Sequence, residues 1–151
     1  MMVKESDLAW LAGFIDGEGS ITIAKRKRQK SINYNYDLQL RIINTDKSLL
    51  DHCQSIIGKG EIKAPLVAKA TYKQSWSWSL WANSAKEALI KVSPYLVGKQ
   101  MQAKLGIELQ DNINMGKKLR PGGRYQSTPR NEIEIREHLF KEMKQLNKRG
   151  S

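Results

Sequence analysis

Two early stretches of the chain alternate between apolar and polar residues. The first covers residues 20–28 and the second covers residues 36–43, and their apolar positions are Ile21, Ile23, Leu38, Leu40 and Ile42. Because successive side chains of a strand point to opposite faces, this period of two predicts strands that are apolar on one side only. The pattern therefore predicts a hairpin with one apolar face and one polar, cationic face.

Apolar residues at helical spacing predict one helix before this hairpin and one after it. A first helix is predicted to end at Asp16, with Ser6 or Asp7 as its N-cap. A second helix is predicted over residues 45–57, with Thr45 or Asp46 at its start and glycine immediately after its end. The order so far is helix, two strands, helix.

A second hairpin is predicted further along the chain. Residues 61–64 form one arm, and the segment "YKQSWSWSLW" forms the other, with Trp76, Trp78 and Leu80 alternating against serines. Tryptophans on a strand can stack on nucleic-acid bases, but at this alternate spacing core packing is the favoured interpretation.

The C-terminal half is predominantly helical. Helices are predicted from Asn83 or Ser84 to Val92, over residues 99–111, and over about 129–147 with a frayed tail. The loop "NMGKKLRPGGRYQSTP" separates the last two. The prediction is one α+β domain over residues 1–151, in the order αββαββα, with helices packed on one face of an antiparallel sheet.

Charge narrows the choice of partner. The 151 residues carry a formal net charge of +11, with an isoelectric point near 9.8. Such a chain repels itself unless a polyanion is near, so nucleic acid is the first candidate and an anionic membrane surface the second. No apolar run is long enough to cross a bilayer and no signal peptide is recognisable. We expect no membrane partner.

Cys53 is the single cysteine. With one cysteine the chain cannot form an internal disulfide, and Cys53 has no zinc-ligand spacing with the two histidines. We interpret it as a small buried apolar residue. The expected location is intracellular, and the bacterial cytoplasm and an organelle fit equally well.

The cations gather on the polar face of the predicted sheet. A two-stranded ribbon of this kind fits the major groove, where long side chains at alternate positions reach base edges. A merely solvated sheet face is the alternative. The positions predicted to contact DNA are Thr22, Ala24, Arg26, Arg28, Lys30, Asp37, Gln39, Arg41, Glu61, Lys63, Ser75 and Ser77.

Two acids lie among three glycines where the first helix meets the first strand. Asp16 and Glu18 stand at the helix C-terminus, where the helix dipole disfavours negative charge. An acid beside a phosphate is repelled unless a cation lies between them, and carboxylate oxygens suit Mg²⁺. The acids are therefore candidate ligands of a divalent metal.

The segment "LAGFIDGEG", residues 11–19, resembles the motif that names the LAGLIDADG homing endonucleases, and "LVGKQMQA" further along supports the likeness. A single motif implies a homodimer. The resemblance implies that the motif helices of two subunits pack together through Leu11, Ala12, Gly13, Ile15, Asp16 and Gly17. It implies that Glu18 and the Gly17 carbonyl hold metal, and that Lys99 lies beside the scissile phosphates.

For two further acids, one inside the motif and one outside it, the resemblance implies a less direct role. Asp16 corresponds to an acid that is usually structural. Asp46 stands where relatives often carry a polar residue that orders active-site water, so we predict a catalytic role for it, as an extra ligand or in an altered water network.

The resemblance implies a site-specific endonuclease that binds a long pseudo-palindromic duplex and cuts both strands with Mg²⁺, leaving 3′ overhangs. Other divalent ions such as Mn²⁺ would also serve, and Ca²⁺ would give a complex that does not cut. Two alternatives stay open on the same fold: a maturase that binds intron RNA, and a DNA-binding regulator without catalysis.

Overall fold

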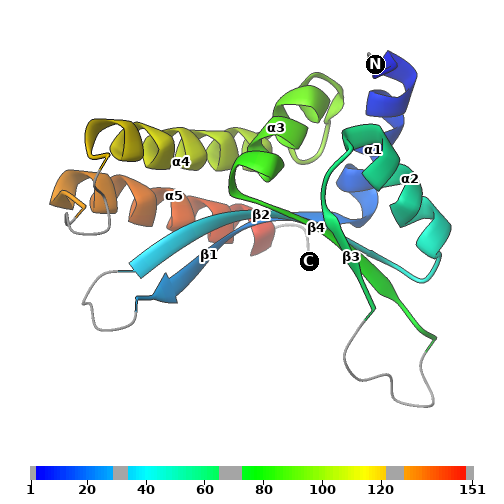
Figure 1. Ribbon diagram of the computed structural model, residues 1–151, viewed down its shortest axis with the longest axis horizontal. Coiled ribbons are helices and arrows are strands. Elements are labelled where there is room, and N and C mark those ends of the chain that lie inside the picture. The colour runs from blue at the N-terminus through cyan, green and yellow to red at the C-terminus, as the bar shows by residue number, and fades with distance from the viewer. Residues whose placement is uncertain (1–2, 29–33, 65–72, 122–127, 149–151) are drawn as a thin grey trace.

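The computed structural model describes residues 3–28, 34–64, 73–121 and 128–148 (Figure 1). Its elements in chain order are α1 (Glu5–Glu18), β1 (Gly19–Lys27), β2 (Tyr34–Asn44), α2 (Lys47–Ile57), β3 (Glu61–Lys63), β4 (Trp76–Trp81), α3 (Ala82–Val92), the 3₁₀ turn η1 (Ser93–Tyr95), α4 (Gln100–Leu119) and α5 (Arg130–Lys148).

The four strands form one antiparallel sheet in the order β1-β2-β4-β3. The helices gather on one side of it and leave the other side uncovered (Figure 1). This arrangement confirms the predicted α+β class and the position of the helices. It also gives the sheet one face for the core and one for a ligand.

Strand register aligns the apolar positions as the alternation predicts. Ile21 pairs with Leu40 and Ile42 pairs with Trp78, and all four side chains are fully or almost fully buried. The Trp78 indole N–H donates to the carbonyl oxygen of Lys59 at 3.0 Å, so its polar group is satisfied inside the fold. Core packing was the correct interpretation for Trp78, and Trp76 packs partly buried against the same core.

Helix ends differ from the prediction. α3 begins at Ala82, before the predicted start at Asn83 or Ser84. α1 begins at Glu5 after Lys4, which makes no side-chain capping bond, so neither Ser6 nor Asp7 is its cap. It continues through Glu18 because Gly17 accepts helical geometry, and it ends where the Gly19 N–H bonds the Ile15 carbonyl. Both motif acids therefore lie within the last turn of the helix.

α4 continues to Leu119, eight residues beyond the predicted end at 111 and into the predicted loop. Gly116 is buried there against charged side chains of α5, so packing between the helices outweighs the low helix propensity of glycine. The end of α4 is thus a packed part of the fold.

The α5 helix is fixed to the sheet by a polar cluster. The Glu137 carboxylate accepts from the Tyr36 hydroxyl and pairs with the Lys25 ammonium at 2.8 Å. Burial would raise the pKa of Glu137, but these two donors outweigh it and hold that pKa below its ordinary value. Burial also raises the pKa of Tyr36, so the hydroxyl keeps the proton it donates.

Cys53 lies fully buried in α2, and burial raises the pKa of its thiol to about 12. Its interpretation as a small core residue is confirmed. None of the described helices combines the length and apolarity needed to span a membrane.

Candidate functional site

Asp16, in the last turn of α1, holds together two segments that are far apart in the sequence. Its carboxylate accepts from the backbone N–H groups of Val97, Gly98 and Lys99, at 2.8, 3.1 and 2.9 Å. These donors immediately precede α4, where backbone N–H groups lack partners within the helix. Asp16 therefore has a structural role, as predicted for the first motif acid.

Lys99 completes this junction from the opposite direction. Its ammonium group donates to the Asp16 carbonyl oxygen at 2.7 Å, and the residue is partly buried. A helix C-terminus leaves carbonyl groups unpaired, so a lysine at this position satisfies one of them. The Lys99 ammonium therefore lies at the carbonyl of Asp16, the residue two positions before Glu18.

Glu18, the last residue of α1, differs from Asp16. Its side chain is exposed, and among the described residues no hydrogen bond or ion pair involves its carboxylate. The described part of the chain also contains no group of three or more His, Cys, Asp or Glu residues that could hold a metal ion by itself. Glu18 is therefore free to bind something outside the chain.

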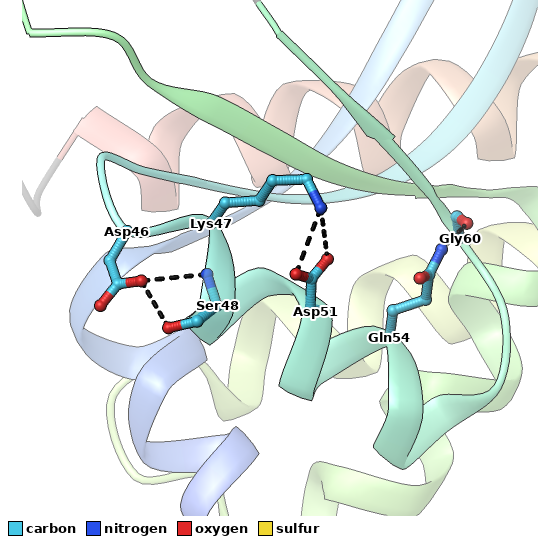
Figure 2. A network of polar contacts seen from close by, with 6 residues as sticks. All are labelled: Asp46, Lys47, Ser48, Asp51, Gln54 and Gly60. Carbon is cyan, nitrogen blue, oxygen red and sulfur yellow. Dashed lines mark hydrogen bonds and ion pairs between the residues drawn. The ribbon is translucent and has the colours of Figure 1, made fainter.

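Asp46 has a structural role, as one of the two residues predicted to cap α2. It is the N-cap of α2 and accepts from the backbone N–H of Ser48 at 3.0 Å and from the Ser48 hydroxyl (Figure 2). These bonds hold the pKa of Asp46 below its ordinary value. The cap explains an acid at this position without catalysis, and a place for Asp46 in the reaction stays a prediction.

The two sides of α1 face different surroundings. Leu11, Ala12 and Ile15 are fully buried in the core of the single chain, so the prediction that their side chains contact a second subunit is wrong. The period of the helix points them toward the sheet. The Asp16 carboxylate is likewise bonded within its own chain and is not available to a partner.

The outer side of α1 carries two of the three motif glycines. At Gly13 and Gly17 an added Cβ would meet no atom within 4 Å, so the fold of the single chain does not require glycine at either position. Apolar side chains lie exposed nearby: Trp10 is 37% exposed, and Val97, bonded to Asp16, is 87% exposed. We call Trp10, Gly13, Gly17 and Val97 the outer face of α1.

The uncovered side of the sheet carries most of the predicted DNA-contacting positions. Pairing places Thr22 beside Gln39, Ala24 beside Asp37 and Lys63 beside Ser77. These positions alternate with the buried ones, so they share the open face, which also holds Arg26, Arg41 and Glu61. Ser75 lies just before β4, and Lys30 lies outside the described residues.

Arg26 and Arg28 occupy different surroundings although both were predicted on this face. The Arg26 Nε donates to Asp37 at 3.0 Å, and its guanidinium lies 5.8 Å from the centre of the Trp81 ring. Arg28 follows the end of β1 and lines a cavity with residues of α4 and α5. The strand alternation does not apply beyond Lys27, where β1 ends.

Three residues on the open face were missed. Ser79 pairs with Arg41, Trp81 pairs with Gln39, and Ile43 pairs with Ser77. Ile43 and Trp81 are 48% and 42% exposed. The alternation of β2 and β4 was the signal that could have identified them.

A family model described as LAGLIDADG endonuclease matches residues 11–115. The chain belongs to the LAGLIDADG endonuclease family. The LAGLIDADG motif of this chain covers the last two turns of α1 and the first residue of β1. It thus includes Asp16, which is bonded within the fold, and Glu18, which is exposed and unpaired among the described residues.

Solved LAGLIDADG structures share this fold. I-CvuI in complex with its target is 22% identical, with 95% of this chain and 85% of that chain covered and a TM-score of 0.73. The archaeal intron-encoded I-Vdi141I, complexed with DNA, is 16% identical over 94% and 84%, with a TM-score of 0.72. I-SmaMI bound to cleaved DNA is 19% identical over 90% of this chain but 43% of its own, with a TM-score of 0.67. No curated protein matches the chain.

Proposed function

We propose that this protein is a site-specific endonuclease that cuts both strands of a DNA duplex as a homodimer. The observation that carries the proposal is the unpaired Glu18 carboxylate at the edge of a basic sheet face. An acid without a partner, in a chain with a net charge of +11, is costly to keep near phosphate unless it binds a cation. Family membership gives the class of reaction.

The open face of the sheet supplies the surface that reads DNA. β1 starts directly after Glu18, and the Ser20 hydroxyl donates to the Arg41 carbonyl oxygen at 3.4 Å across the first strand pair. The catalytic end of α1 is thus continuous with the strands that carry the cationic side chains. A duplex lying on those strands brings a phosphate to Glu18.

A divalent cation fits this position by the chemistry of the donors. The Glu18 carboxylate and the Gly17 carbonyl offer oxygen ligands, which Mg²⁺ prefers, and DNA phosphate and a second subunit would provide the rest. When bound, such an ion lowers the pKa of water and neutralises charge that develops on phosphorus. I-CvuI, a structural relative, has been crystallised in the presence of Ca and of Mg. We propose Mg²⁺ for cutting, with Mn²⁺ as a substitute and Ca²⁺ in a non-cleaving complex.

Lys99 and Asp16 hold the backbone of the site in place. Asp16 fixes the backbone of residues 97–99, and Lys99 fixes the last turn of α1 through the Asp16 carbonyl. A preorganised cation beside a phosphate stabilises the negative charge of the transition state. Lys99 therefore positions the motif turn and adds positive charge where the scissile phosphate would lie.

A second copy of the chain would complete the site. The outer face of α1 is apolar and has two glycines that leave room for close backbone approach. Two such helices packed about a twofold axis would place two Glu18 residues side by side and the two open sheet faces along one duplex. The cognate site would then be long and pseudo-palindromic, with cuts that leave 3′ overhangs.

The test uses supercoiled plasmid libraries that carry randomised sites, incubated with the protein with and without Mg²⁺. We expect Mg²⁺-dependent linear product from a subset of sites, with 3′ overhangs at the sequenced ends. DNA binding without cutting under every metal condition would favour the regulator. Preferential binding of structured intron RNA without cutting would favour the maturase.

A further inference from the structure

A second charged region lies at the opposite end of the sheet from α1, where the ends of α4 and α5 lie over the β1–β2 hairpin (Figure 1). A cavity of about 520 Å³ lies between the end of the hairpin and these helix ends. Cations dominate its charged groups. The lining includes Arg28, Tyr34, Lys117, Arg120, Thr128 and Arg136.

Two of these cations have a structural partner. Arg120 Nη1 donates to the Glu132 carboxylate at 3.0 Å, and Arg136 Nη2 donates to the same carboxylate at 3.2 Å. Gly116 leaves the space for this cluster, since a Cβ there would lie 2.8 Å from Arg120 Nη2 and 2.9 Å from Glu132 Oε2. The cluster joins α4 to α5, and this explains Arg120 and Arg136.

The other two cations have no such explanation. Among the described residues, neither Arg28 nor Lys117 has a hydrogen bond or ion pair, and both are exposed. The acid in the lining, Asp37, is already paired with Arg26. Four cationic side chains therefore face one cavity, with Glu132 shared between two of them.

The electrostatics of Arg136 agree with this excess of positive charge. Burial lowers the pKa of Arg136, and the charges of Arg120 and Arg28 lower it further, although Glu132 acts in the opposite direction. An anion in the cavity would relieve this repulsion.

We propose that the cavity binds a phosphate group of a nucleic-acid strand that continues past the β1–β2 hairpin. Guanidinium groups bind phosphate through two parallel hydrogen bonds, and lysine adds a point charge. A nucleic-acid strand is the favoured source because Arg26, near the end of β1 on the open face, and Arg28, which follows β1 and lines the cavity, are only two residues apart. The cationic surface thus continues around the end of the sheet. This inference rests on the proposed function.

The main test compares Lys117→Ala with Lys118→Ala. Both residues are exposed cations in the last turn of α4, but Lys117 lines the cavity and Lys118 does not. Binding to a random-sequence duplex is measured over a range of salt concentrations. Lys117→Ala should reduce the slope of log affinity against log salt by about 1, as expected for one lost phosphate contact, and Lys118→Ala should leave it unchanged. Circular dichroism checks that both variants are folded.

A second arm identifies the source of the phosphate. Thermal unfolding of the free protein is followed as inorganic phosphate replaces chloride at equal ionic strength. Stabilisation that Lys117→Ala removes, together with an unchanged salt slope, would make free phosphate the ligand and overturn the nucleic-acid assignment. Equal slopes for both variants, with no phosphate effect, would overturn the site itself.

These outcomes are distinct from failure of the proposed function. Wild-type binding to duplex DNA that does not respond to salt would overturn the DNA-binding face as a whole. A salt-dependent wild type that never cuts DNA would overturn the endonuclease and leave the cavity assignment standing.

Discussion

Two regions meet at the end of α1, and each contains one acid. On the inner side, Asp16 accepts three backbone N–H groups from residues 97–99 and is part of the fold. Glu18, in contrast, has no partner in the described chain and directly precedes the first strand of the cationic face. The comparison teaches that two motif acids two residues apart can have different surroundings, one bonded inside the fold and the other left open to solvent, because a helix points them about 200° apart.

Glu18→Gln gives the largest expected effect. The change removes a charge but keeps the size of the side chain, so Mg²⁺-dependent cutting should fall by about 10²–10³-fold while DNA affinity stays near wild type. The free energy of unfolding should change by less than about 0.5 kcal/mol, since nothing in the fold uses this carboxylate. Cleavage assays and urea unfolding measure the two quantities. Cutting at the wild-type rate would show that Glu18 is not the metal ligand.

Asp16→Asn should lower the stability of the fold, which Glu18→Gln leaves unchanged. An amide keeps one acceptor oxygen and replaces the other with an N–H donor, so at least one of the three backbone N–H groups loses its partner. We therefore expect the free energy of unfolding to fall by about 2–3 kcal/mol. Cutting should fall as well, because the position of Lys99 depends on this turn. Urea unfolding beside Glu18→Gln makes the comparison direct. A variant as stable as wild type would contradict the structural role of Asp16.

Gly13→Leu tests whether the outer face of α1 forms the contact between subunits. The single chain has room for the new side chain, so each subunit should fold, whereas packing between two α1 helices should lose about 1–3 kcal/mol. Sedimentation at several concentrations measures the dimer. Gly106→Leu is the matched control, because a Cβ there would lie 2.5 Å from Leu38 Cδ1 and should disrupt the fold itself. A Gly13→Leu protein that dimerises like wild type would place the interface elsewhere.

Asp46→Ala should give the smallest effect. Loss of the N-cap of α2 should lower the melting temperature by about 3 °C at neutral pH. The pKa of Asp46 is depressed in the folded chain, so its contribution is present above the ordinary Asp pKa of about 4 and is lost as the pH falls through the folded value. The difference from wild type should therefore shrink in acid. Asp46→Ser, which keeps a cap without titrating, is the control, and a loss of cutting in Asp46→Ser would point to a catalytic role for the acid.

Much of this molecule could be predicted because local patterns carry the information. The alternation in β1, β2 and β4 fixed which residues are buried, and Trp78 and Leu40 are in the core as expected. The extension of α4 could not be predicted, because Gly116 inside a helix is favoured only by the α5 residues that pack on it. The exposed Trp81 and Ile43 were missed because burial of an apolar side chain depends on whether a helix covers that face.

The sequence by itself determined the family, the two faces of the sheet and the positions of the motif acids. Only the tertiary structure decided which acid is bonded within the fold and which is left exposed. The donors to Asp16 lie 81–83 residues away in the chain, and a contact between such distant residues leaves no periodic signal. The burial of Leu11, Ala12 and Ile15, and the open space beside Gly13, also depend on which side of α1 the rest of the chain covers. A local pattern gives the spacing of side chains along a helix, and packing selects the side that becomes the interior.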